Sequence, residues 1–316
     1  MVKYDLQSSA DKRRLAEAVV WGGAVGDALG AGYEHRVHRG DPIDLSHMVG
    51  AVLTVGSSAR IELPAGLWTD DTSMTIALID SLSANHGSVD AADEAARWKA
   101  WLERGEYSSV DGVAVGTGGT TRKALLEYGH GVDAIDANGN GSLMRTSPLA
   151  LVGAKDADVM RSSAVTHAHK TSKIACVIWC WFLRRLASGS APRAAWEEAL
   201  DSVGEPVLEI VSTRLREIWR LPEHEINSTG YVVDTLEACA WLVTNEERCD
   251  CYRAVVEGAV RLAGDTDTIA KIAGEAAAIA YGPEDVPSTW RSETAKPELL
   301  EKAVDQLAAL IPDSLA

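Results

Sequence analysis

The chain has 316 residues, of which 46% are hydrophobic, and its 46 acidic residues outnumber its 30 basic residues to give a net charge of −16. The length and hydrophobic fraction suffice for a sizeable buried core, whereas the acidic surplus argues against nucleic acid as a partner, because a nucleic-acid backbone favours a basic surface. The polar, charged N-terminus, the five cysteines without paired CxxC motifs and the lack of an uninterrupted apolar run of about twenty residues favour a cytoplasmic protein with no signal peptide and no membrane span.

Helical periodicity predominates along the chain. The only β-like run lies at residues 49–55, within a loop-rich region at 35–66, and no alternating βαβ units occur. The sequence therefore predicts an all-α fold, with one compact domain over residues 1–316 that is large enough to stand as a monomer. The predicted helices span residues 10–29, 72–84, 90–104, 119–128, a pair within 156–188, 192–202, 206–218, 231–244, 250–262, 267–281 and about 296–310.

The glycine- and alanine-rich stretch at residues 22–34 contains two carboxylates, Asp27 and Glu34. Close packing of one helix on another explains the small residues but does not explain the acids. A carboxylate in such surroundings is a candidate metal neighbour or general base.

Two acidic segments, far apart in the sequence, each stand directly before an apolar helix. The first is Thr69-Asp70-Asp71-Thr72, and the second is Gly264-Asp265-Thr266-Asp267-Thr268. Carboxylate and hydroxyl oxygens suit hard divalent cations such as Mg²⁺. Two such segments folded together could hold a pair of metal ions, which can activate a water and clamp a substrate.

Asp or Thr before a helix is also an ordinary N-cap. A cap needs one residue, however, and each segment offers a pair of aspartates. The stretches that follow, residues 74–79 and 269–274, are too apolar or small to be exposed, so the carboxylates at their starts should be buried. Because unpaired buried charge is strongly unfavourable, we expect a cation beside them.

Glycines at 116, 118 and 119 precede Thr120-Thr121-Arg122. A glycine loop that opens a helix can present backbone N–H groups to phosphate, and the alternative is a plain loop. The segment does not match a Walker A motif, because no Gly-Lys-Ser/Thr follows.

Residues 138–148 begin with two Asn-Gly pairs, which are typical of turns. The segment either caps the next helix or forms a close-approach loop in which Asn140 and Ser142 bind hydroxyl groups and Arg145 anchors a carboxylate or phosphate. His167 and His169 are two residues apart and make poor zinc ligands without a third ligand, so a hydrogen-bonded structural histidine remains the alternative.

Taken in order, the segments resemble the ADP-ribosylglycohydrolase family over about residues 15–282. The matching segments are Gly26-Asp27-Ala28-Leu29-Gly30 with Glu34, Trp68-Thr69-Asp70-Asp71-Thr72, Gly139-Asn140-Gly141-Ser142-Leu143-Met144-Arg145, Thr166-His167, Gly230-Tyr231-Val232-Val233-Asp234-Thr235-Leu236 and Gly264-Asp265-Thr266-Asp267-Thr268. The resemblance implies an all-α fold with a binuclear centre of two Mg²⁺ ions, or of Mn²⁺ in some members.

By motif match, the resemblance also implies residue roles. The implied metal ligands are Thr69, Asp70, Asp71, Asp265, Asp267 and Thr268. Glu34 and Asp71 are the implied catalytic residues, and the implied substrate-binding residues are Gly116, Gly118, Gly119, Asn140, Gly141, Ser142 and His167. The family often has a proline shortly before its acidic residue, whereas Gly32-Tyr33 precede Glu34 here, which predicts a more mobile loop.

The function that the resemblance implies is metal-dependent removal of ADP-ribose from an ADP-ribosylated substrate, with arginine-linked ADP-ribose on protein as the first expectation. Water would attack ribose C1″ while Glu34 or an aspartate of the metal site takes its proton. A small molecule that contains ADP-ribose, serine or O-acetyl linkages, and modified nucleic acid remain open as substrates. Two alternatives are an ADP-ribose-binding pseudoenzyme and a two-metal phosphohydrolase of an ADP-ribose-like nucleotide.

Overall fold

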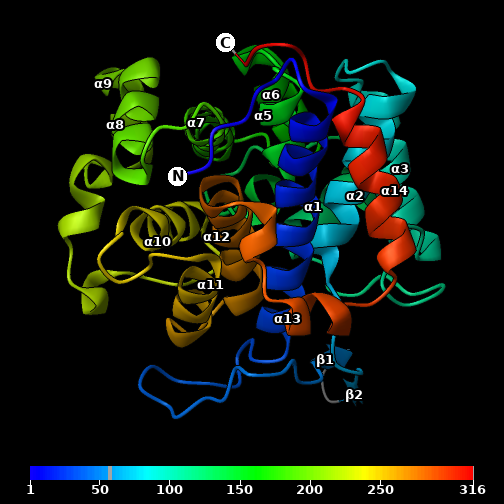
Figure 1. Cartoon of the computed structure of the whole chain (residues 1–316). Coiled ribbons are helices and arrows are strands. Elements are labelled where there is room, and N and C mark those ends of the chain that lie inside the picture. The colour runs from blue at the N-terminus through cyan, green and yellow to red at the C-terminus, as the bar shows by residue number, and fades with distance from the viewer. Residues whose placement is uncertain (56–58, 316) are drawn as a thin grey trace.

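The structure is a computed structural model that describes residues 1–55 and 59–315. Helices dominate it, so the prediction of an all-α fold is confirmed (Figure 1). The α-helices are α1 (Ser9–Ala31), α2 (Asp70–Ala84), α3 (Ala91–Arg104), α4 (Gly119–Arg122), α5 (Ser147–Leu151), α6 (Asp156–Ala164), α7 (Lys170–Ala187), α8 (Pro192–Val203), α9 (Glu205–Val211), α10 (Val232–Thr244), α11 (Tyr252–Arg261), α12 (Thr266–Tyr281), α13 (Ser288–Glu293) and α14 (Pro297–Ala308).

The small residues of α1 let it pack closely and antiparallel against α12 in the centre of the molecule (Figure 1). Gly22, Gly26 and Gly30 recur at every fourth position and therefore lie on one face of the helix. A methyl group at these glycines would collide in turn with α12 at Ala278, at Ala270 and at the backbone near Thr266. Because the two helices are antiparallel, the C-terminal end of α1 lies beside the N-terminal end of α12.

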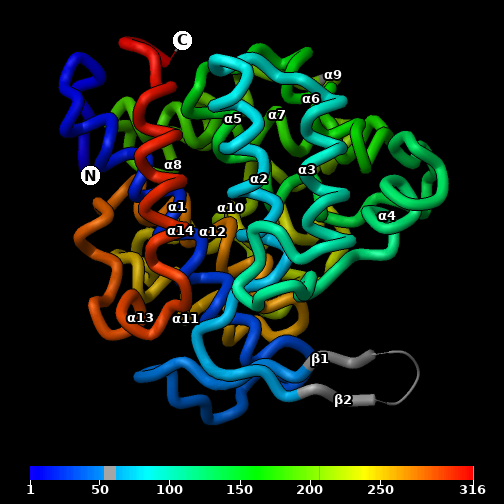
Figure 2. The backbone as a smooth tube through the Cα atoms, turned by 90° about the vertical axis from the view of Figure 1, so that its right-hand side faces the viewer, coloured from blue at the N-terminus to red at the C-terminus, as the bar shows by residue number. Residues whose placement is uncertain are grey.

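The start of α2 lies beside the same end of α1. Asp27 of α1 accepts hydrogen bonds from the backbone N–H groups of Thr69 and Thr72. Most residues of α2 are buried because α1, α3 and α14 pack around it, and Figure 2 shows α2 between α3 and the red α14. One helix end and two helix starts therefore meet at one place.

One two-stranded antiparallel sheet accompanies the helices among the residues that the structure describes. β1 (Val52–Val55) pairs antiparallel with β2 (Ala59–Glu62), with Val52 opposite Glu62. The β-like run predicted at 49–55 thus contains β1, whereas β2 was not predicted.

Short elements account for most of the other differences. The predicted helix at 119–128 is α4 followed by a π-helical turn, Lys123–Tyr128, and the predicted helix at 206–218 is α9 followed by a separate 3₁₀ turn, Leu215–Arg220. α5 and α13 were not predicted, because helices of five and six residues are too short to show a period. Among the described residues, no helix combines the length and the apolar character that a membrane crossing requires.

Candidate active site

The start of α2 is capped without its two aspartates. Thr69 is the N-cap residue, and its hydroxyl oxygen accepts from the Asp71 N–H at 3.4 Å. Asp27 accepts from the N–H groups of Thr69 and Thr72, each at 3.0 Å, and from both threonine hydroxyls. Capping therefore explains Thr69 and Asp27, and it leaves Asp70 and Asp71 free for another role.

Asp71 connects the two acidic segments. Its Oδ2 atom accepts from the hydroxyl of Thr268 at 3.3 Å, and it shares the single hydroxyl proton of Thr69, at 3.2 Å, with Asp27. Its Oδ1 atom is buried and has no hydrogen-bond partner among the described residues. Burial, followed by the nearby charge of Asp27, raises the pKa of Asp71 well above its ordinary value. A buried carboxylate oxygen without a donor is suited to a bound cation.

The remaining carboxylates gather beside it. Glu34, Asp265 and Asp267 each place a carboxylate oxygen within 4.8 Å of the other two. Burial, and then the charges of Glu34 and Asp265, raise the pKa of Asp267 well above its ordinary value. Burial and Asp265 also raise the pKa of Glu34. Such a group of oxygens is stable only with protons or a cation between its members, and this donor set fits Mg²⁺ or Mn²⁺.

Asp265 is held by a distant part of the chain. Asn140 donates from Nδ2 to Asp265 Oδ2 at 2.7 Å and to Thr235 Oγ1 at 2.9 Å. The backbone N–H of Asp265 donates to the carbonyl of Ser228 at 2.9 Å. The sequence of the 227–235 segment predicted no chemical role. In the structure this segment supports Asp265 and Asn140 through these hydrogen bonds. Asn140 positions a carboxylate, which is a role that its sequence context did not predict.

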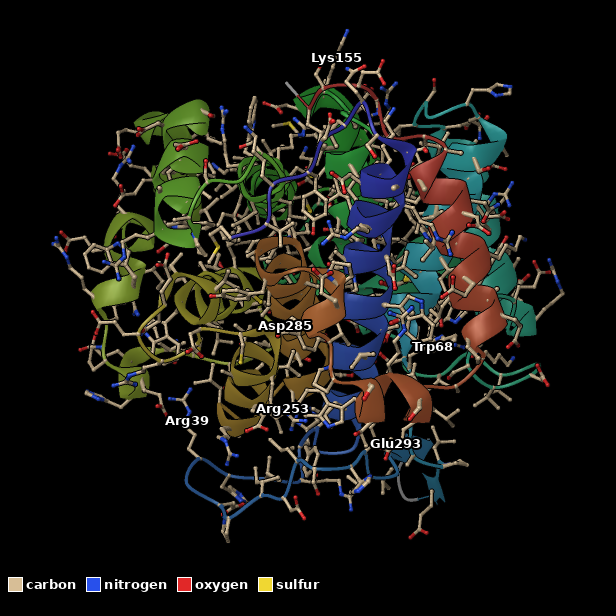
Figure 3. All side chains as sticks on the ribbon, in the orientation of Figure 1. Arg39, Trp68, Lys155, Arg253, Asp285 and Glu293 are labelled. Atoms are coloured by element: carbon tan, nitrogen blue, oxygen red, sulfur yellow. The ribbon has the colours of Figure 1, made fainter. Side chains whose placement is uncertain are left out.

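The loop that follows Glu34 is anchored to the helices at two points. Arg39 donates to the carbonyl of Leu262 at 3.0 Å, and Glu293 of α13 accepts from the N–H of Met48 at 2.7 Å (both side chains are labelled in Figure 3). These contacts hold the loop without the proline that precedes the acidic residue in many members of the resembled family.

Most of the predicted site residues surround one cavity of about 410 Å³. Ser142 does not line it, because its side chain is buried behind the loop and accepts from Ser163 Oγ at 2.9 Å. The predicted residues that line the cavity are Glu34, Thr69, Asp70, Asp71, Gly116, Gly118, Gly119, Asn140, Gly141, His167, Asp265, Asp267 and Thr268. Among the other residues that line it, Thr121 belongs to the polar run after the glycines and Met144 to the matched 139–145 segment, whereas nothing in the sequence singled out Thr117.

The three glycines on one wall differ in whether the protein itself requires them. Gly116 has a φ of +71°, and a methyl group there would overlap the carboxylate of Asp70. Gly118 has an ordinary φ of −64°, and a methyl group on Gly119 would meet no described atom within 4 Å. Neither backbone conformation nor protein packing requires glycine at 118 or 119, so their open face leaves room for a ligand.

Arg145 does not face the cavity, and the interpretation that it anchors a ligand is wrong. Its side chain is 1% exposed, with the guanidinium carbon 3.8 Å from the ring centroid of Trp98. It donates to the carbonyl of Gly141 at 2.6 Å and so supports the loop from behind. His167, in contrast, is buried and lines the cavity.

Comparison with known proteins identifies relatives over nearly the whole chain. The family model for ADP-ribosylglycohydrolase matches residues 8–315. The chain is 31% identical over 310 residues to the ADP-ribosylarginine hydrolase Tri1 of Serratia proteamaculans, and the matched region covers 94% of this chain and 80% of that protein. It is 30% identical over 301 residues to the ADP-ribosyl-[dinitrogen reductase] glycohydrolase of Rhodospirillum rubrum, and the matched region covers 91% of this chain and 93% of that protein.

A solved structure supports the same assignment. The ADP-ribosylglycohydrolase-related protein complex superimposes with a TM-score of 0.71 at 27% identity, over 95% of this chain and 98% of that chain. The sequence motifs, the fold and these matches agree. The chain therefore belongs to the ADP-ribosylglycohydrolase family of enzymes.

Proposed function

We propose that this protein is a metal-dependent hydrolase that removes ADP-ribose from arginine side chains of a protein substrate by cleaving the bond at ribose C1″. The observation that carries the proposal is the group formed by Glu34, Asp265 and Asp267, whose oxygens lie within 4.8 Å of one another at the cavity. The names of two relatives, an ADP-ribosylarginine hydrolase and a dinitrogen reductase glycohydrolase, support the substrate class.

The acidic segments supply the oxygen ligands for two divalent cations, Mg²⁺ or Mn²⁺. The proposed ligands are Thr69, Asp70, Asp71, Asp265, Asp267 and Thr268, and the position of Glu34 within the carboxylate group adds it to this set. When bound, such cations supply Lewis acidity and a water of lowered pKa. The charges that burial makes unfavourable here are the ones that a cation would stabilise.

Glu34 is the proposed acceptor of the proton from the attacking water. Its side chain is 38% exposed, so it reaches both the carboxylate group and the open cavity. Burial and Asp265 raise its pKa, which makes the carboxylate a better base than an ordinary surface glutamate. Asp71, whose Oδ2 is occupied by two threonine hydroxyls, is the second candidate.

The part of the cavity wall formed by Gly118 and Gly119 suits the diphosphate. The two glycines leave this wall open, and no side chain of theirs competes with the phosphate oxygens. Asn140, which donates to Asp265, and Gly141 line the same cavity, and we place the ribose beside them, close to the carboxylates. A guanidinium leaving group also agrees with the acidic character of the whole chain, whose net charge is −16.

The test is hydrolysis of an arginine-ADP-ribosylated protein with Mg²⁺ or Mn²⁺, with the released product identified by mass and EDTA as the control. Metal-dependent release of intact ADP-ribose supports the proposal. Release of AMP would identify a phosphohydrolase instead, and tight binding of ADP-ribose without turnover on any linkage would identify a pseudoenzyme.

Asp267→Asn tests the ligand set within the same assay. We expect it to abolish turnover while the circular dichroism spectrum stays unchanged, because Asn keeps the shape but removes the charge that holds the metal. Full activity of this variant, or of the wild type in excess chelator, would contradict the metal proposal.

A further inference from the structure

The hydroxyl of Thr166 stands between an arginine and the histidine of the cavity. Arg145 donates from one terminal nitrogen to Thr166 Oγ1 at 2.8 Å. Thr166 Oγ1 lies 2.8 Å from His167 Nδ1. All three side chains are buried, and Thr166 is 0% exposed.

The direction of these hydrogen bonds follows from the chemistry of the three groups. A guanidinium only donates, so Thr166 Oγ1 must accept from Arg145. The hydroxyl proton then needs an acceptor, and among the described residues only His167 Nδ1 lies within hydrogen-bonding distance in a suitable direction. If Nδ1 carried a proton instead, the buried hydroxyl proton would have no partner, which is unfavourable.

We infer that Arg145 and Thr166 are positioning residues that fix His167 as the neutral tautomer with its proton on Nε2, so that the ring presents one hydrogen-bond donor to the cavity. The ring of His167 lies beside the 139–141 loop: a methyl group at Gly141 would come within 2.9 Å of His167 Cε1, and one at Gly139 within 3.6 Å of Nε2. No described residue accepts a hydrogen bond from Nε2.

The surroundings also oppose a charged imidazole. Burial, and then the charge of Arg145, lower the pKa of His167 to about 3. Arg145 itself stays charged at neutral pH, because burial lowers its pKa only to about 10 and its guanidinium lies on the face of Trp98. His167 therefore acts at neutral pH as a fixed donor and not as a general acid.

A donor at this position selects an acceptor oxygen on the ligand. If the proposed function holds, on which this step rests, the acceptor is an oxygen of the ADP-ribose unit, a ribose oxygen or a phosphate oxygen, next to the loop at Gly141. An Nδ1–H tautomer would present a lone pair there and would be repelled by the same oxygen.

The tautomer is tested in the ligand-free protein by long-range ¹H–¹⁵N NMR of the histidine rings at pH 7. The signal of His167, one of eight histidines, is assigned by its absence in His167→Gln. We expect the wild type and Thr166→Ser to show protonated Nε2 and unprotonated Nδ1. We expect Thr166→Val, which keeps the shape but removes the hydroxyl, to show a mixture of tautomers.

Binding of ADP-ribose measured by calorimetry gives the second readout. We expect Thr166→Val to bind between about twofold and tenfold more weakly and Thr166→Ser to bind as the wild type does, because one neutral hydrogen bond is at stake. A protonated Nδ1 in the wild type, or an unchanged ring signal in a folded Thr166→Val, would overturn the inference. The NMR result does not depend on the ligand, so a failure of the proposed function is seen separately, as an absence of ADP-ribose binding in the wild type or as binding without hydrolysis in the activity assay.

Discussion

At the scale of single residues, the buried carboxylate of Asp27 is the contact that joins α1 to the start of α2. Thr72 donates to it twice, from the backbone N–H at 3.0 Å and from the hydroxyl at 2.6 Å. Hydrogen bonds to a buried charge are stronger than neutral ones, and their loss leaves the charge less well solvated. The position of Asp70 and Asp71 therefore depends on a residue that is not among the proposed metal ligands.

We expect Thr72→Val to lower the free energy of unfolding by about 1.5–3 kcal/mol, because the substitution keeps the shape of the side chain and removes a donor to a charged group. The matched control is Thr75→Val on the same helix. Thr75 is equally buried, but its hydroxyl donates to the backbone carbonyl of Asp71, so its loss should cost less than about 1 kcal/mol. Urea unfolding of both variants measures the difference, and equal values would contradict this role of Asp27.

Sequence patterns predicted the site where its contacts are local. Asp70, Asp71, Asp265 and Asp267 stand in short acidic segments before apolar helices, and that pattern predicted their proximity and their burial, although Asp70 is only partly buried. The bond from Asn140 to Asp265 joins residues 125 positions apart, and the Asn140 side chain could as well have served a turn. Such a contact depends on how α10, α12 and the 138–148 loop pack, which no local pattern encodes.

At the scale of elements, the packing interface between α1 and α12 determines where the two acidic segments meet. Gly26 lies at its middle, where a methyl group would collide with the backbone carbonyl of Ala270. Backbone atoms cannot rotate away as a side chain can, so the two helices would have to separate. The glycines are thus required by packing, which was one of the two explanations for the 22–34 stretch.

We expect Gly26→Ala to lower the free energy of unfolding by about 1–3 kcal/mol through overpacking, although alanine favours helix over glycine by about 1 kcal/mol. Metal-dependent activity should fall as well, because Asp267 at the start of α12 would shift relative to Asp71. Thermal unfolding and the hydrolysis assay measure the two effects. A variant as stable and as active as the wild type would contradict the close packing of α1 on α12 at Gly26.

Gly119→Ala separates packing from ligand binding. No described atom lies within 4 Å of the added methyl group, so the stability of the protein should stay the same or rise slightly. If the diphosphate passes this wall, affinity for ADP-ribose should fall roughly tenfold or more through overpacking in the complex. Unchanged affinity in calorimetry would place the diphosphate elsewhere.

At the scale of the whole molecule, the long helices were predictable and the short connections were not. α1, α2 and α12 each have a clear apolar or small-residue pattern and a capping residue near the start, so their bounds agree with prediction within two residues. The π-helical turn at Lys123–Tyr128 and the short α5 owe their form to tertiary packing. Fold class follows from the long elements, whereas the cavity is lined both by the starts of α2 and α12 and by the segments 116–121 and 139–141.

The concentration of buried acid at one place links the stability of the whole molecule to pH and metal. Burial, and then Asp27, raise the pKa of Asp70 to about 7 from an ordinary value of 3.8. Burial also raises the pKa of Glu94, which lies away from the cluster, to about 7. Between pH 4 and pH 7 these two carboxyl groups therefore bind more protons in the folded chain than in the unfolded chain, and the stability that they contribute falls as pH rises through this range. The lowered pKa of His167 acts in the opposite direction below about pH 6.5, but it concerns a single group.

In EDTA, we expect the melting temperature to fall by about 3 °C or more between pH 5 and pH 8, since each kcal/mol corresponds to roughly 2–4 °C in a protein of this size. Saturating Mg²⁺ should reduce this decrease in melting temperature, because a cation stabilises the ionised form of Asp70 and its neighbours. The part of the decrease that is due to Glu94 should persist. Glu94→Gln removes the contribution of Glu94 to this pH dependence. In that variant, Mg²⁺ should therefore abolish the pH dependence that remains. A melting temperature that rises with pH in EDTA would contradict the raised pKa values of Asp70 and Glu94. An identical pH dependence with and without Mg²⁺ would show that the buried carboxylates are not a cation site.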